Sequence, residues 1–158
     1  MNRVKVLSAL AALAVGGALA ANTAPASASP NFNVWFAVQN NDASASMIRT
    51  SGIPSGVSGL ISPAAAVPPG GTDPASGHAT FSLPYPGVGH SSSASLSYAN
   101  ASGLTSSCSY TIKVTENSAT SFTLHFTTSD ATRCSVPADA SNGDGQFTTQ
   151  TYILNWQT

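Results

Sequence analysis

Apolar and polar side chains alternate along several short stretches of the chain, and this alternation predicts strands. In NFNVWFAVQ, residues 31 to 39, every second side chain is large and apolar: Phe32, Val34, Phe36 and Val38. Because successive side chains of a strand point to opposite faces, the stretch has one apolar face and one mainly polar face. We expect a strand here, with its apolar face in a core.

Two further stretches alternate in the same way and are joined by a short polar segment. CSYTIKVT, residues 108 to 115, and SFTLHFTT, residues 121 to 128, flank ENSAT, which predicts a hairpin. Runs at 80–83, 93–98 and 148–156 predict additional strands. Apolar spacing of three and four residues, typical of helices, is missing after residue 28. The predicted fold class is all-β: an antiparallel β-sandwich of about six to eight short strands with one disulfide.

The long connections are rich in proline and glycine, above all between residues 51 and 89. Proline lacks the N–H that an interior strand donates, so this region is expected to form turns, edge strands and surface loops. In VPPGGT, Pro69 and Gly70 suit the centre of a type II turn. SNGDGQF, residues 141 to 147, predicts a hairpin loop. A calcium loop is the alternative, and it requires more oxygen ligands than Asp139 and Asp144 supply.

The first 28 residues have the pattern of a secretory signal peptide. Arg3 and Lys5 precede an apolar run, and the Ala-Ser-Ala of residues 26 to 28 offers the small side chains that a signal peptidase requires. The run is shorter than the roughly 20 residues of a bilayer span, and we expect no transmembrane segment in the mature chain. The expected organisation is a signal peptide over 1–28 and a single secreted domain over 29–158, extracellular or periplasmic.

Charged residues are sparse, and the formal net charge is −1. Once the leader is removed, Arg49, Lys113 and Arg133 are the remaining cations. Such a chain has no basic patch for nucleic acid phosphates, and it cannot hold an anionic membrane by electrostatics alone. Nucleic acid is therefore excluded as a partner.

The two cysteines, Cys108 and Cys134, are expected to pair because an exported chain meets an oxidising compartment. The bond would close about 27 residues, which the chain-entropy model values at about 3.5 kcal/mol. Two reduced, buried thiols are the alternative. A zinc site is not supported, because no His or carboxylate cluster accompanies the sulfurs.

The stretch GHSSS comes one residue short of the Gly-x-Ser-x-Gly elbow that presents a nucleophilic serine, here Ser91. The elbow requires a following helix and a second glycine, whereas Ser93 occupies that position and the next residues alternate as a strand. An acid placed before a histidine base would leave only Glu116 and His125. We therefore interpret Ser91 as a loop residue and expect no catalytic residue.

The histidines, His78, His90 and His125, are widely separated and belong to no short ligand motif, so we expect no metal and no cofactor. Dispersed aspartates likewise give no support to a glycosidase pair.

The aromatic side chains divide into core candidates and one surface candidate. Trp35 and Trp156 are interpreted as core packing. Tyr85, held between Pro84 and Pro86 in a loop, is the candidate for an exposed aromatic that contacts a ligand.

The order of turn residues over 32–98 resembles the N-terminal half of the aegerolysins and of similar small bacterial β-sandwich crystal proteins. The features that carry the resemblance are Asn40-Asn41-Asp42, Ser51-Gly52, Pro63, the turn over residues 67–72 and Leu96-Ser97-Tyr98. The resemblance implies a non-enzymatic protein that recognises membrane lipids and acts with a larger pore-forming protein. It assigns no binding residue.

Two hypotheses follow. The first is a secreted binding domain for a membrane lipid or another cell-surface ligand. The alternative is a small secreted hydrolase or a proteinaceous enzyme inhibitor, the latter acting through the loop around Tyr85.

Overall fold

The computed structural model describes residues 30–63, 65–102 and 106–156, and over these ranges it contains strands and no helix. The long strands are β1 (Asn31–Asn40), β6 (Ala79–Pro84), β7 (Ser91–Asn100), β8 (Ser107–Ser118), β9 (Ser121–Thr128) and β12 (Gln146–Trp156). The short ones are β2 (Met47–Arg49), β3 (Val57–Ser58), β4 (Ala66–Val67), β5 (Thr72–Asp73), β10 (Cys134–Ser135) and β11 (Ala140–Asn142). The predicted all-β class is confirmed, whereas the expected signal peptide lies outside the described residues.

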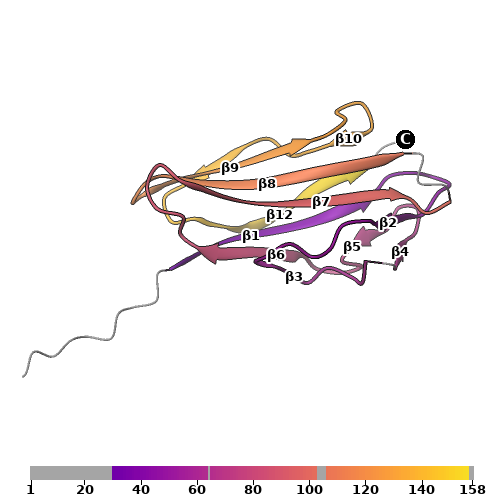
Figure 1. Cartoon of the computed structure of the whole chain (residues 1–158), viewed down its shortest axis with the longest axis horizontal. Coiled ribbons are helices and arrows are strands. Elements are labelled where there is room, and N and C mark those ends of the chain that lie inside the picture. Colours follow the sequence, from indigo (N-terminus) through magenta and orange to yellow (C-terminus); the bar gives the residue numbers. More distant parts are fainter. Residues whose placement is uncertain (1–29, 64, 103–105, 157–158) are drawn as a thin grey trace, which may run out of the picture.

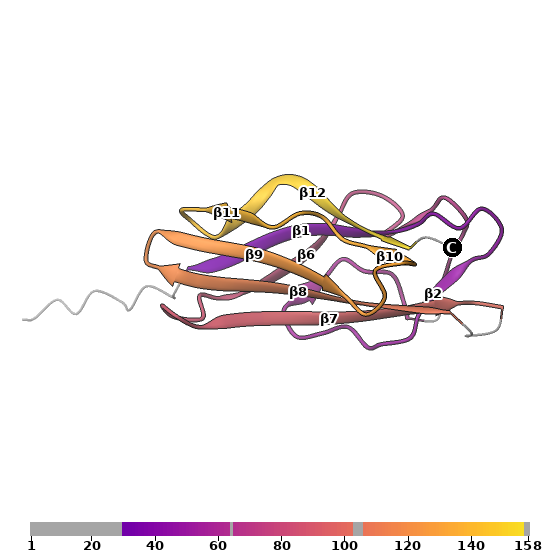
Figure 2. The same cartoon turned by 90° about the horizontal axis from the view of Figure 1, so that it is seen from above.

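The strands form two sheets that pack face to face as a sandwich (Figures 1 and 2). The first sheet has the order β10-β12-β1-β6-β3, with β5 also paired to β1. The second has the order β11-β9-β8-β7-β2-β4. The strand pairs of the described residues are antiparallel except for β1 and β12, which run parallel. The expected antiparallel arrangement therefore holds everywhere but at that pair.

The alternating apolar residues fill the space between the sheets. Phe32, Val34, Phe36 and Val38 of β1 are each 0% exposed, as their spacing predicts. Strands β8 and β9 form the predicted hairpin, in which Ile112 pairs with Phe126. Burial of each such side chain stabilises the fold by about 1.5–3 kcal/mol, and the core is one continuous cluster.

The proline-rich segment supplies short edge strands and turns, as expected. Between β4 and β5 the Gly71 N–H donates to the carbonyl oxygen of Pro68 at 2.9 Å. Gly70 has a φ of 70°, the positive value that the third position of a type II turn requires. The predicted turn is thus confirmed.

A disulfide is one of the links between the sheets. The disulfide between Cys108 on β8 and Cys134 on β10 has a Cα–Cα distance of 5.8 Å, and both residues are buried. This confirms the predicted pairing. Because β8 belongs to the second sheet and β10 to the first, the bond crosses the sandwich.

Another link is a buried polar network that the sequence did not predict. Asp73 on β5 of the first sheet accepts a hydrogen bond from the Tyr98 hydroxyl of β7 at 2.7 Å, and it lies 3.8 Å from Nε of Arg49 on β2. Asp73 also accepts from the backbone N–H of Ile61 at 2.8 Å, while the Arg49 guanidinium donates to the carbonyl oxygens of Ser51 and Ile61. The Arg49 and Asp73 side chains are 0% exposed, so each is the other's countercharge.

Candidate functional site

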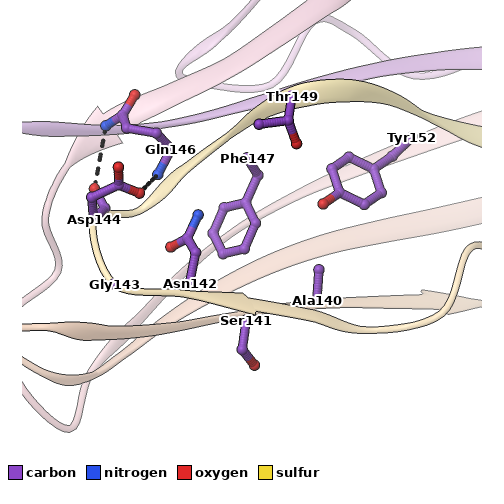
Figure 3. Close-up of a pocket in the computed structure, with 9 residues that line it drawn as sticks. All are labelled: Ala140, Ser141, Asn142, Gly143, Asp144, Gln146, Phe147, Thr149 and Tyr152. Atoms are coloured by element: carbon purple, nitrogen blue, oxygen red, sulfur yellow. Dashed lines mark hydrogen bonds between the residues drawn. The ribbon is translucent and has the colours of Figure 1, made fainter.

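A hollow of about 410 Å³ opens between β11 and β12, at the side of the sandwich where the two sheets part (Figure 3). Its volume falls within the roughly 300–1,000 Å³ of small-ligand sites. The residues that line it are Ala140, Ser141, Asn142, Gly143, Asp144, Gln146, Phe147, Thr149 and Tyr152. All come from the last quarter of the chain.

The hollow exists because β11 and β12 are consecutive but belong to different sheets. β11 pairs with β9 and β12 pairs with β1, so residues 143–145 cross from one sheet to the other. The prediction of a hairpin loop over residues 141 to 147 is therefore wrong, because the strands on either side of it are not paired with each other. Side chains hold the crossing: Oδ1 of Asn142 accepts from the Gly145 N–H at 2.8 Å, and Oδ1 of Asp144 accepts from the Gln146 N–H at 2.9 Å.

Gly145 is required at the end of this crossing. Its φ is 69°, and a Cβ atom would lie 3.1 Å from the Tyr85 ring and 3.3 Å from Cβ of Phe32. Both the backbone conformation and the lack of space exclude larger residues. The chain can therefore turn tightly into β12 at the mouth of the hollow.

An irregular stretch of β12 shapes the opposite wall. Val34 of β1 pairs with Phe147, but Phe36 pairs with Tyr152, so residues 148–151 of β12 face the single residue Trp35 of β1. The extra residues leave the ladder, as in a bulge. They bring the exposed Thr149 to the rim of the hollow.

The floor of the hollow is aromatic. Figure 3 shows Phe147 and Tyr152 pointing from β12 toward β11, with the Tyr152 hydroxyl directed toward Phe147. Both side chains are largely buried, at 3% and 7% exposure. The Tyr152 ring packs on Phe126 of β9 at a centroid distance of 5.3 Å. The floor is thus part of the core and is rigid.

The rim is polar and carries a single charge, that of Asp144. Gln146 is fixed, because its Oε1 accepts from the Asn33 amide at 2.7 Å and its Nε2 donates to the Asn31 carbonyl oxygen at 2.8 Å. The amide nitrogen of Asn142, the second carboxylate oxygen of Asp144 and the Thr149 hydroxyl make no hydrogen bond to the described residues. These three groups can therefore bond a ligand.

Tyr85, the predicted ligand contact, lies behind this rim. Its ring packs on Phe122 at a centroid distance of 4.7 Å, and its hydroxyl donates to the backbone carbonyl oxygen of Asp144. The side chain is half-buried. In the structure Tyr85 holds residues 143–145 in place through this hydrogen bond. Direct contact between Tyr85 and a ligand stays a prediction.

The residues considered for serine catalysis are not brought together: Ser91 and His125 lie on the outer face of the second sheet, whereas Glu116 points into the sandwich. Ser91 begins β7 and is exposed, so its interpretation as a loop residue is wrong. Glu116 is buried and accepts a hydrogen bond from the Gly87 N–H at 2.9 Å, which ties down the loop before β7. His125 lies on the outer face of β9, as expected, where Nδ1 is 2.7 Å from the Asp139 carboxylate. No triad is assembled from Ser91, Glu116 and His125.

Trp35 lies on the outer face of the first sheet, so its interpretation as a core residue is wrong, whereas Trp156 is buried at 2% exposure. The indole of Trp35 is half-buried and stacks on the His78 imidazole, with ring centroids 4.1 Å apart and an interplanar angle of 19°. The alternation along β1 already indicated the outer face, because Trp35 lies on the same side of the strand as the polar residues Asn33 and Gln39.

Among residues 30–63, 65–102 and 106–156, no group of three or more His, Cys, Asp or Glu side chains is placed to hold a metal ion. That part of the chain also contains no helix long and apolar enough to cross a bilayer.

Comparisons with known proteins add no assignment. No protein-family model, no curated protein and no solved structure matches the chain.

Proposed function

We propose that the chain is an exported, non-enzymatic binding domain that attaches to a cell-surface ligand through the hollow between β11 and β12. The observation that carries the proposal is a rigid aromatic floor beneath a polar rim on which three groups are free of internal hydrogen bonds. Such a combination fixes and orients a small ligand. A membrane lipid and a surface glycan are the two ligand classes that the proposal covers.

The enzyme alternative finds less support. Ser91 and His125 lie on the outer surface of the second sheet, while the Glu116 carboxylate is buried and already bonded to the Gly87 N–H. A general base must reach the nucleophile within hydrogen-bond distance. Hydrolysis of an ester or glycoside that disappears in Ser91→Ala would support an enzyme and contradict the proposal.

The inhibitor alternative also loses support from the placement of Tyr85. Its ring and hydroxyl are engaged with Phe122 and Asp144, so the side chain is not presented to a protease. The pore-forming partner remains an implication of the aegerolysin resemblance alone.

The test is retention of the purified protein on surfaces of defined composition: liposomes, a glycan array and intact cells. The variant Thr149→Tyr places a bulky ring at the rim of the hollow. Gln150→Tyr is the matched control, because Gln150 is the next exposed residue and does not line the hollow. We expect binding that Thr149→Tyr abolishes and Gln150→Tyr preserves. A protein that binds none of these surfaces, or two variants that behave alike, would contradict the proposal.

A further inference from the structure

We infer that the ligand is an uncharged oligosaccharide that extends from the hollow, past the paired amides of Asn33 and Gln146, to the Trp35–His78 stack on the outer face of the first sheet. The inference rests on the proposed function and names the ligand class and a second contact region.

The charge of the site selects against anionic ligands. The hollow is lined by neutral residues and by Asp144, and none of its lining residues is Lys or Arg. Phosphate headgroups, sulfates and carboxylates are held by cations, usually by arginine forks. The side chains that lead away from the hollow, Asn33, Gln146 and Trp35, are also uncharged. The surface therefore fits a neutral, polyhydroxylated ligand and not a phospholipid headgroup.

The polar groups match hydroxyl chemistry. A sugar hydroxyl both donates and accepts, so it needs neighbours of both kinds. At the rim the Asn142 amide nitrogen donates, the free Asp144 oxygen accepts, and the Thr149 hydroxyl does either. All three make no hydrogen bond to the described residues, so a ligand need not displace an internal partner.

Gln146 connects the hollow to the outer face of the first sheet. It lines the hollow and is also the direct register partner of Asn33 across the parallel β1–β12 pair. Trp35 follows two residues after Asn33 and therefore points to the same face. From the spacing between neighbouring strands and the rise per residue, the Cα atoms of Gln146 and Trp35 are expected to lie roughly 8 Å apart. A ligand that spans both must contain at least two linked sugar rings.

The Trp35 indole supplies an apolar contact at the far end of this path. The stack on His78 covers one face of the half-buried ring and orients it, so a ligand would contact the part of the indole that His78 leaves open. The negative face of an aromatic ring attracts weakly positive C–H groups, which one side of a sugar ring offers. An aromatic surface flanked by amides matches the two chemistries of a saccharide, its apolar face and its hydroxyl edge.

The experiment uses the purified protein on an array of neutral, sialylated and sulfated glycans and on vesicles of phosphatidylcholine with and without phosphatidylglycerol. The strongest soluble neutral oligosaccharide is then titrated calorimetrically into the wild type, Thr149→Tyr, Trp35→Leu and Thr127→Ala. Thr127 is an exposed residue of β9 on the second sheet and serves as the control. We expect a loss of about tenfold or more in affinity for Thr149→Tyr and Trp35→Leu and no change for Thr127→Ala.

Trp35→Leu can also weaken the fold, so a second measurement uses the wild type. Trp156 is buried, and collisional quenching of tryptophan emission therefore reports Trp35. Saturating oligosaccharide is expected to protect Trp35 from acrylamide. Binding that depends on Thr149 but leaves Trp35 unprotected would overturn the extended path. Binding to vesicles or to anionic glycans alone would overturn the assignment to an uncharged oligosaccharide and leave the proposed function standing. Binding to none of these surfaces would overturn both.

Discussion

The Tyr98 hydroxyl donates a hydrogen bond to the Asp73 carboxylate across the interior of the sandwich, at 2.7 Å. Tyr98 belongs to the second sheet and Asp73 to the first, so the bond ties the two sheets together where no solvent can replace it. A buried carboxylate needs each of its partners, because an unsatisfied buried oxygen bears the full cost of desolvation.

We predict that Tyr98→Phe lowers the free energy of unfolding by about 1–3 kcal/mol, because it leaves the Asp73 carboxylate with one partner fewer. Tyr110→Phe is the matched control. The Tyr110 hydroxyl is equally buried and has no hydrogen-bond partner in the described residues, so its removal is expected to be neutral or stabilising. Urea denaturation followed by circular dichroism checks both variants. Equal losses would contradict the role given to the Tyr98–Asp73 bond.

Alkaline pH should destabilise the fold through the same two tyrosines. Burial raises the pKa of Tyr98 and of Tyr110 above the ordinary value of 10.0, and the negative charge of Asp73 raises the Tyr98 pKa further. Above pH 10 the unfolded chain releases protons that the folded chain keeps, so stability falls as pH rises. Each tyrosine contributes a slope of about 1.4 kcal/mol per pH unit. Urea titrations from pH 9 to pH 11.5 should show a shallower fall in Tyr110→Phe; an unchanged slope would contradict burial of this hydroxyl.

Acid pH should act through Asp42. The backbone N–H groups of Ser44 and Ala45, together with the Ser44 hydroxyl, hold the pKa of Asp42 below its ordinary value of 3.8. The stabilisation is present above that value and is lost as pH falls through the lowered pKa. Asp42→Asn keeps an acceptor oxygen but cannot titrate, so its stability should fall less between pH 5 and pH 2 than that of the wild type. Parallel curves in a urea titration would count against the prediction.

Removing the disulfide tests the covalent link between the sheets. The bond joins residues separated by 26 positions, and the chain-entropy model assigns such a loop about 3.5 kcal/mol. We predict that the double variant Cys108→Ala, Cys134→Ala loses about that amount and keeps its β-sheet circular dichroism spectrum. A loss below about 1 kcal/mol would show that the unfolded chain is already restricted around this loop.

The strands were predictable from the sequence because a two-residue period belongs to the strand itself. Phe32 to Val38, and the hairpin that contains Ile112 and Phe126, needed no knowledge of distant residues. The misplacement of Trp35 has a simple cause. The hydrophobicity of Trp35 suggests the core, but its place in the two-residue alternation of β1 puts it on the outer face. The alternation determines the face, because successive side chains of a strand point to opposite sides of the sheet.

The hollow was not predictable, because local turn chemistry does not say which sheet receives the next strand. Residues Asn142 to Gly145 form a tight turn with the residue types of a hairpin, yet the turn leads from one sheet to the other. The network of Arg49, Asp73 and Tyr98 is equally hidden, since its members are 24 and 25 positions apart. The only indication in the sequence that Arg49 is buried was its position two residues after Met47, which places both side chains on the same face of β2.

The most direct test of ligand binding at the hollow is a two-dimensional ¹H–¹⁵N spectrum of the wild-type protein. The protein is titrated with the neutral oligosaccharide that binds it most tightly on the glycan array. We predict shifts at the amides of Asn142 and Thr149 and at the indole N–H of Trp35, with the Trp156 indole and Thr111 on the second sheet unmoved. Shifts confined to the outer face of the second sheet, or none at saturation, would contradict binding at the hollow.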